Sequence, residues 1–519
     1  MSASLRILTR IGDLLSALVL VAMLSLAGCS ASESPHVIRF ALNTAPVSLD
    51  PRHATDATSA RLNRLLYAQL VDFDAQSRVV PSLAHWQQLD VQHYRFVLGD
   101  RNRRFHNGQI VQAADVAATY AYVLDAANGS PYRAPLAHIS RIEVIDDDTI
   151  DFYLERPDTL FVERLTIGIL PAKLIAQGHD FHRLPIGSGA FRFVAHHGAG
   201  DISLERTADQ QQLRFLEVRD PTVRVLKLLR GEVDMLQNDV APELINWLAD
   251  RQGIRLQRRH GSNYTYLGIN HAEPALSDRR VREAIACAID RRKLIHYLLA
   301  DGARPAQSLL PPEHWAGHRG LPARHCSTND SRLLLQQAGY DARNKPRLVY
   351  KTSTDPLRVR LATVIREQLN SAGFDVQVQS LDWGTFYADI KSGNFELYSL
   401  TWVGIRSPDS FEYIFHSRSL PPAGANRGHY VNQQADTLID TALAQTHVEA
   451  MLPSLLALQQ LLNEDLVYVP LWYEDHVVAM REHLTGYTLS ADGNYDGLAN
   501  VSLSDTMPPL AAHATGMMD

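Results

Sequence analysis

The thiol of Cys29 is the side chain in this sequence with the clearest chemistry. It ends Leu26-Ala27-Gly28-Cys29, directly after an apolar run that begins at Leu14. A thiol at this place can be alkylated with a diacylglyceryl group, and the small residues before it let a peptidase reach the backbone. The apolar run follows two arginines and is too short to remain as a membrane span. The sequence therefore predicts a signal peptide over residues 1–28 and a lipid anchor at Cys29; a plain secretory signal with a chance cysteine is the alternative.

Two further thiols, Cys287 and Cys326, would face an oxidising compartment in an exported chain. They can form one disulfide. Cys287 lies in a predicted helix among small and apolar residues, so a buried free thiol is an equal alternative. Two cysteines alone make a poor metal site, and no metal is expected.

Catalytic motifs are missing from the sequence. No His-Glu-x-x-His, Cys-x-x-Cys, Gly-x-Ser-x-Gly or Gly-Lys-Ser/Thr pattern occurs. The Gly-x-Gly within Gly187–Phe191 lacks the third glycine and the helix of a phosphate-binding loop, so a tight turn is the better interpretation. We therefore predict no cofactor, no catalytic residue and no enzymatic activity.

Aromatic and polar residues instead gather where predicted strands and helices end, which is where binding pockets form. Each group by itself could be core packing, but four of them in an exported chain without catalytic motifs favour a ligand pocket. The four segments are Ser130–Tyr132, Tyr264–Tyr266, Leu381–Phe386 and Trp402–Arg406.

Length and charge place limits on the fold and on the partners. The 519 residues, of which 45% are hydrophobic, can bury more than one core, and several domains are expected. The net charge is −7, and no dense run of Lys and Arg occurs. Nucleic acid is therefore excluded as an expected partner.

The elements that must position these residues alternate between strands and amphipathic helices, which is typical of the α/β class. An acidic triplet at 146–148 predicts the turn of a hairpin. Predicted strands are 37–42, 94–98, 141–144, 149–154, 266–270, 347–351, 375–380, 396–402, 467–473 and 477–480, and predicted helices are 113–127, 278–299, 356–372 and 383–392. The segment 347–402 forms two successive βαβ units, whose parallel strands should place a crevice at their carboxyl ends.

Many of these segments resemble one bacterial family, the extracellular solute-binding proteins of family 5, which includes the dipeptide- and oligopeptide-binding proteins of ABC importers. The most specific stretch is Tyr94–Asp100 through Arg104–Gly108 to Ala114–Val116. Further matching segments run nearly from end to end: Ser48–Pro51, Gly187–Phe191, Gly231–Asp234, Tyr266–Asn270, Val281–Ala284, Ala288–Asp290, Ala338–Tyr340 and Val469–Tyr473.

The resemblance implies a periplasmic-binding-protein-like fold (class II, cluster C) with two lobes around a hinge and an additional domain. It also implies a monomer that closes on its ligand by a hinge motion and then meets a membrane permease and its ATPase. The expected parts are lobe 1 at 29–60, 186–265 and 476–519, the additional domain at 61–185, and lobe 2 at 266–475.

Ligand contacts are predicted in both lobes. By the resemblance, Tyr132 is an aromatic residue that faces the ligand, and Thr55 and Ala57 line the pocket from the first lobe. Tyr264, Trp383 and Trp402 complete the aromatic part of the site, and Asn426 begins a loop near the cleft.

The resemblance is incomplete at Gly404. Peptide binders of the family carry an aspartate shortly after the Trp-x-Gly segment, and it pairs with the α-ammonium group of the peptide. Here Ile405 and Arg406 stand instead, which puts a free-amine peptide in doubt. If Arg406 faces the cleft, its planar fork suits a carboxylate, phosphate or sugar acid; pairing with an acid of the protein, or exposure to solvent, is the alternative.

The expected function is that of a lipid-anchored, exported component of an ABC importer that binds peptides or peptide-like solutes, located in the periplasm or at the cell surface. A ligand sensor or a binder of cell-wall fragments that does not import is one alternative. An exported hydrolase is another.

Overall fold

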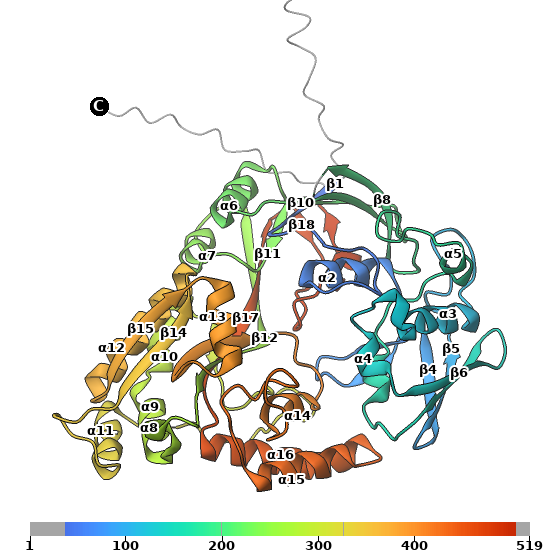
Figure 1. Ribbon diagram of the computed structural model, residues 1–519. Coiled ribbons are helices and arrows are strands. Elements are labelled where there is room, and N and C mark those ends of the chain that lie inside the picture. Colours follow the sequence, from blue (N-terminus) through green and yellow to red (C-terminus); the bar gives the residue numbers. More distant parts are fainter. Residues whose placement is uncertain (1–36, 199, 325, 505–519) are drawn as a thin grey trace, which may run out of the picture.

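The first lobe lies at the top of Figure 1. Its sheet has a hydrophobic core on each face, and strand β1 contributes residues to both cores. The structure, a computed structural model, describes residues 37–198, 200–324 and 326–504. In β1, Ile38 and Phe40 face α2, whereas Ala41 faces α6 and α7, because neighbouring strand residues point to opposite sides. The elements of this lobe are β1 (Val37–Leu42), α2 (Ala57–Leu66), α5 (Ala172–Ala176), β8 (Phe191–Gly198), β9 (Asp201–Arg206), β10 (Gln212–Glu217), α6 (Pro221–Arg230), β11 (Met235–Gln237), α7 (Pro242–Ala249), β18 (Leu484–Thr485), η3 (Asp496–Asn500) and β19 (Ser502–Leu503).

The additional domain, on the right of Figure 1, has a sheet and a core of its own. Its main sheet has the order β4-β5-β7-β6, and α3 packs against it. The elements are β2 (Val71–Phe73), β3 (Val79–Pro81), β4 (Ala84–Asp90), β5 (His93–Leu98), α3 (Ala113–Leu124), η1 (Ala126–Asn128), α4 (Arg133–Leu136), β6 (Ile139–Val144), β7 (Thr149–Leu154) and η2 (Phe161–Arg164).

The second lobe, at the lower left of Figure 1, is a sheet with helices on both faces. One face packs against α9, α10, α11 and α12, and the other against α13 to α16. The elements are α8 (Pro274–Ser277), α9 (Arg279–Ala288), α10 (Arg291–Leu299), β13 (Ala303–Pro305), α11 (Thr328–Gln337), β14 (Arg347–Ser353), α12 (Pro356–Ala372), β15 (Asp375–Leu381), α13 (Trp383–Ser392), β16 (Leu397–Trp402), α14 (Ser410–Phe415), α15 (Gln433–Leu443) and α16 (Val448–Asp465).

Two long antiparallel strands, β12 (Ile254–Ile269) and β17 (Tyr468–Arg481), join the lobes. They link the sheets into one path of strands, β15-β14-β16-β12-β17-β11-β1-β10-β9-β8, with β13 beside β17. Their pairing shifts register between Arg259 and Asn263, where β12 bulges. Gly261 in the bulge lies so close to the carbonyl of Glu474 that a Cβ atom would be only 2.4 Å from that oxygen, so a side chain does not fit. The bulge marks the junction between the lobes.

Most predicted elements are confirmed. Strand 37–42 and helices 356–372 and 383–392 have the predicted bounds. The predicted hairpin is β6 and β7, with Asp146 accepting hydrogen bonds from the backbone N–H groups of Asp148 (2.9 Å) and Thr149 (2.7 Å). β14, β15 and β16 are parallel, as the two βαβ units require.

Three predictions about element length are wrong. The helix expected over 278–299 is divided into α9 and α10, because Asp290 caps the second helix by accepting from the N–H of Lys293 at 3.0 Å. The strands expected at 467–473 and 477–480 are the single strand β17, and the strand expected at 266–270 is the end of β12.

The core clusters divide the chain close to the expected domain limits, with one shift. Helix α2, which the limit at residue 60 would cut, contributes Leu62 and Leu65 to the core of the first lobe. The separate core of the additional domain begins at Leu70 and ends at Ile169. We therefore propose that the additional domain spans about residues 68–169; the other limits stay proposals as predicted.

Other features concern the export signal, the cysteines and the Gly-x-Gly turn. Cys29 lies outside the described residues, among which no helix has the length and apolar character to cross a membrane.

The sulfur atoms of Cys287 and Cys326 are bonded to each other. Gly187 and Gly189 pack directly against the backbone of the α2 end, which leaves no phosphate cradle there.

Candidate functional site

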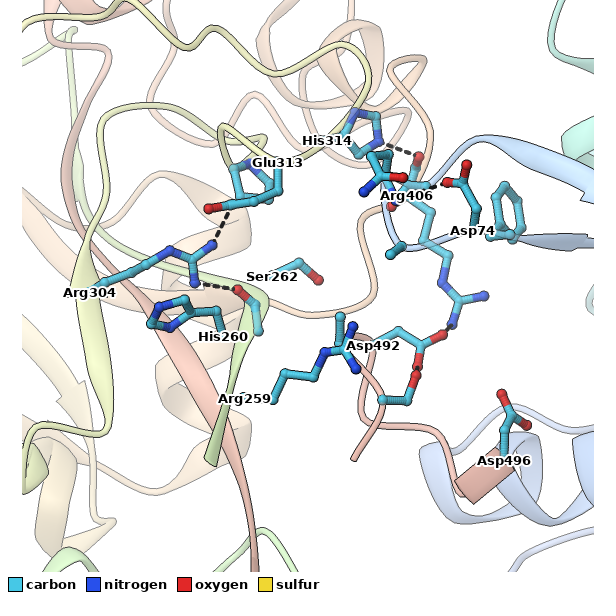
Figure 2. A pocket seen from close by; sticks show the side chains of 18 of the residues that line it. Asp74, Arg259, His260, Ser262, Arg304, Glu313, His314, Arg406, Asp492 and Asp496 are labelled. Atoms are coloured by element: carbon cyan, nitrogen blue, oxygen red, sulfur yellow. Dashed lines mark hydrogen bonds and ion pairs between the residues drawn. The ribbon is translucent and has the colours of Figure 1, made fainter. Parts of the chain in front are cut away.

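A cavity of about 510 Å³ lies at the junction between the lobes, next to the bulge in β12. We call it the cleft cavity. Figure 2 shows side chains from four segments around it. The segments are the end of α2 with the β2–β3 turn (Arg64, 73–77), the bulge (259–262), the second lobe (Arg304, Pro311, Glu313, His314, Arg406) and the last part of the first lobe (490–492, Asp496).

The backbone around the cleft cavity is fixed by local hydrogen bonds. In the β2–β3 turn, the Asp74 carboxylate accepts from the N–H groups of Gln76 (2.8 Å) and Arg78 (2.9 Å). At the bulge, the Arg304 guanidinium donates to the carbonyl of Gly261 at 3.0 Å and to the Glu313 carboxylate at 2.7 Å. The walls are therefore ordered without a ligand.

Arg406 lies in the wall and is paired with an acid of the first lobe. Its Nη2 donates to Oδ2 of Asp492 at 2.9 Å, as Figure 2 shows. The same carboxylate accepts from the hydroxyl of Ser490 at 2.6 Å and from the backbone and amide of Asn494. Burial would raise the pKa of Asp492, but Arg406 and these hydrogen bonds outweigh it and hold the pKa below its usual range. Arg406 thus faces a charge that is already satisfied.

His314 fixes the backbone of Arg406. Its Nδ1 accepts from the N–H of Ala316 at 3.0 Å, so Nε2 carries the proton and donates to the carbonyl of Arg406 at 2.7 Å. Burial lowers the pKa of His314 to about 4. The neutral ring therefore ties the Arg406 loop to the segment 311–316.

The predicted contacts of the first lobe come together beside the additional domain. Thr55 and Ala57 are exposed at the start of α2, and Asp56 between them caps the helix. The hydroxyl of Tyr132 donates to the carbonyl of Ala54, next to them. The structure thus gathers these three predicted residues, but none of them lines the cleft cavity.

Trp402, Gly404, Ile405 and Arg406 follow one another at the end of β16, and only Arg406 lines the cleft cavity. The Trp402 ring is half-buried and stacks on Tyr266. Gly404 is exposed with φ +73°, a backbone conformation that suits glycine. Ile405 packs on the core beside α14 instead of taking the place of a polar contact.

Trp383, Tyr264 and Asn426 lie in different surroundings. Trp383 at the start of α13 is 58% exposed and stacks on Tyr387. Tyr264 is 2% exposed between Tyr266 and Tyr473, which is a core position. The Asn426 side chain, also 2% exposed, donates to the carbonyls of His416 and Tyr430 and accepts from the N–H of Tyr430. Neither Tyr264 nor Asn426 reaches the cleft cavity, because packing and loop hydrogen bonds occupy them.

Sequence reasoning missed most of the cavity wall. Asp74, Asp492, Arg304 and His314 lie in turns and loops that are far apart along the chain. The polar run Arg259–Ser262 between two apolar strand halves was the available signal, since a bulge at a junction produces this pattern. No group of three or more His, Cys, Asp or Glu side chains in the described ranges could hold a metal ion.

Comparisons with known proteins agree with this architecture. A model for the middle region of the bacterial extracellular solute-binding proteins, family 5, matches residues 78–421. The probable di/tripeptide-binding protein 5 of Pseudomonas aeruginosa is 25% identical over 83% of this chain and 89% of its own length. The peptide transport periplasmic protein SapA of Salmonella typhimurium is 26% identical over 83% and 85%. The oligopeptide-binding protein AppA of Bacillus subtilis, solved with a nonapeptide, superposes with a TM-score of 0.71 at 22% identity, covering 90% of this chain and 99% of that one.

Proposed function

The chain belongs to family 5 of the bacterial extracellular solute-binding proteins, and from this premise we propose that it is the lipid-anchored, substrate-binding component of an ABC importer. It captures peptides or peptide-like solutes by hinge closure and delivers them to a membrane permease and its ATPase. Relatives over most of its length are named as peptide-binding proteins of transport systems. The family binds solutes and is not catalytic.

The observation that carries the proposal is the position of the cleft cavity at the bulge between the lobes. A rotation about the bulge would change the distance between Arg406 of the second lobe and Asp492 of the first. A ligand can drive that closure only if it binds the closed form better than the open form. Because residues of both lobes line one cavity, a ligand there can contact both lobes at once in the closed form and so bind that form more tightly.

The charges of the cleft cavity favour a ligand that carries both signs. Its lining contains carboxylates at Asp74, Glu313, Asp492 and Asp496 and arginines at 64, 259, 304 and 406. A volume of about 510 Å³ is in the range of small-molecule sites, about 300–1,000 Å³. A short peptide or a peptide-like zwitterion meets both conditions.

Native mass spectrometry of the purified mature protein tests the ligand class. Closed binding proteins retain cellular ligand, and we expect a peptide or peptide-like mass that denaturation releases. Calorimetric titration with the released compound should give one site per chain. A retained ligand without any amide bond would overturn the peptide assignment.

The importer role has two alternatives that experiments separate. Loss of uptake of the retained ligand in a deletion strain supports import; normal uptake with loss of a transcriptional or motility response indicates a sensor or a binder of cell-wall fragments. Turnover of a chromogenic peptide or ester panel, abolished by a single substitution, would instead indicate an exported hydrolase.

The lipid anchor is tested at Cys29, outside the described residues. Metabolic labelling with an alkyne fatty acid should mark the wild-type protein, and Cys29→Ser should remove the label and release the protein from membranes. A membrane-bound, unlabelled wild type would contradict the anchor.

A further inference from the structure

Arg427 is a buried cation without an acidic partner. Its side chain is 8% exposed, and within the described ranges no carboxylate lies within ion-pair distance of it. By contrast, the Arg406 guanidinium reaches Asp492. A buried guanidinium without a counter-charge is costly, so its presence calls for an explanation.

Aromatic side chains surround this guanidinium. The Arg427 carbon Cζ lies 4.9 Å from the centre of the Trp402 ring and 5.5 Å from that of Tyr387. Nη1 donates to the hydroxyl of Tyr266 and Nη2 to that of Tyr387, both at 3.3 Å. These bonds are long and go to neutral acceptors, so they satisfy the cation only in part.

A second donor of the same cluster lacks an acceptor. Nε1 of Trp402 is buried, and no hydrogen-bond partner for it is found in the part of the chain that the structure describes. Trp402 stacks on Tyr266 with ring centres 6.3 Å apart. Arg427 and Trp402, which lie against each other, thus both offer N–H donors, and no carboxylate of the described residues accepts from them.

The cluster continues to the surface through α13. Trp383, 58% exposed, stacks on Tyr387 at 5.5 Å with an angle of 7° between the rings. Val403, next to Trp402, is also exposed. An apolar group can therefore rest on the outer rings, next to the guanidinium that donates to the Tyr387 hydroxyl.

The loop of Arg427 is held rigid by its neighbours. Asn426 makes three hydrogen bonds within the loop. A Cβ atom at Gly428 would be 2.5 Å from the carbonyl of Ile269, so the loop passes directly against the end of β12. This packing directs Arg427 inward before any ligand binds, which reduces the ordering cost of binding.

We propose that Arg427, which lies outside the lining of the cleft cavity, is a further anion-recognition residue: it binds the carboxylate of a ligand whose apolar part lies against Trp402, Tyr387 and Trp383. The planar guanidinium fork fits a planar carboxylate with two parallel hydrogen bonds. This inference rests on the proposed function, because it assumes that the ligand enters between the lobes.

Fluorine NMR with two small probes tests this site on the mature protein. The probes are 4-fluorobenzoate and 4-fluorobenzamide, which share shape and ring but differ in charge. We expect the benzoate to bind the wild type at least tenfold more tightly than the amide. Arg427→Met should weaken the benzoate at least tenfold and leave the amide unchanged, and its loss should exceed that in Arg406→Met. Arg347→Met, at an exposed position on β14, is the matched control without effect.

Three results would overturn the inference: no benzoate binding by the wild type, equal affinity for the two probes, or unchanged benzoate affinity in Arg427→Met. If that variant does not fold, as judged by near-UV circular dichroism, Arg427→Lys keeps the charge and removes the fork. It should then weaken the benzoate at least threefold, and unchanged affinity would reject the proposal. Carboxylate binding through Arg427 without any retained peptide would leave this site standing and remove only the peptide assignment.

Discussion

Two arginines of the second lobe, Arg406 and Arg427, hold the same charge in opposite surroundings. Arg406 lines the cleft cavity and is paired with Asp492 across the junction of the lobes. Arg427 lies under Trp402, where its neighbours are tyrosine hydroxyls and aromatic rings. Arg406 thus forms an ion pair between the two lobes, whereas Arg427 forms hydrogen bonds to neutral hydroxyl groups.

The position of an arginine near a cleft does not define its role. A guanidinium that already has a carboxylate gains little from a second anion and must lose the first to bind it. One that is buried with neutral acceptors gains a charge-assisted pair. Whether an arginine joins the lobes or can contact a ligand therefore depends on whether it already has a carboxylate partner, not on its residue type.

Removing the aromatic support of Arg427 should give the largest effect. Trp402→Ala deletes the ring that stacks on Tyr266 and covers the guanidinium, and we expect the free energy of unfolding to fall by about 4 kcal/mol, as for other large-to-small aromatic changes. Trp383→Ala, at an exposed ring, is the matched control and should cost about 1 kcal/mol. Urea unfolding measures both. A smaller loss in Trp402→Ala than in Trp383→Ala would show that the cluster is not a packed unit.

The free energy of unfolding should depend on pH through Glu163 in η2. Burial raises the pKa of this side chain to about 7, and Asp409 and Asp158 act in the same direction. Because the folded protein holds the proton more tightly than the unfolded chain does, this contribution is full below about pH 4.5. It is lost as the pH rises to about 7, up to about 3 kcal/mol in all.

Glu163→Gln should remove this pH dependence, since an amide does not titrate. Urea unfolding at pH 5 and pH 7.5 measures it, with Glu143→Gln on the exposed strand β6 as control. Equal pH dependence in the wild type and Glu163→Gln would contradict the assignment.

The ion pair between Arg406 and Asp492 should make the smallest contribution to the free energy of unfolding. Both side chains are 30% exposed, and pairs of this kind are worth about 0.5 kcal/mol. A double-mutant cycle with Arg406→Met and Asp492→Asn measures the coupling by thermal unfolding. A coupling above about 2 kcal/mol would mean that the pair is a main lock between the lobes and not a weak tie.

Sequence reasoning predicted the elements of the second lobe well because their signals are local. The bounds of α12 and α13 follow from a proline or tryptophan after a capping aspartate and a glycine at the end. It failed for the break between α9 and α10, where Asp290 reads as one more helical residue. It also failed to recognise β12 and β17 as continuous, because the bulge residues 259–262 are polar and resemble a loop.

Of the predicted contact residues, Arg406 lines the cleft cavity and the others lie outside its wall. Sequence reasoning selected Asn426 at the start of a loop, but hydrogen bonds within the loop turn that amide inward, and the next residue, Arg427, lies beneath Trp402. It selected Arg406 but offered no means to find Asp492, 86 residues further along the chain. Side-chain direction within a loop depends on contacts with distant segments, which periodicity does not record.

The sequence by itself determined the α/β class, the family and most strands and helices, because each depends on patterns that lie within a short stretch of chain. It also predicts a lipid attachment at Cys29, which stays a prediction. Only the tertiary structure decided which charges are satisfied. It paired Arg406 with Asp492 across the lobes and left Arg427 among aromatic rings, because electrostatic pairing acts over a few ångströms in space, whatever the separation along the chain.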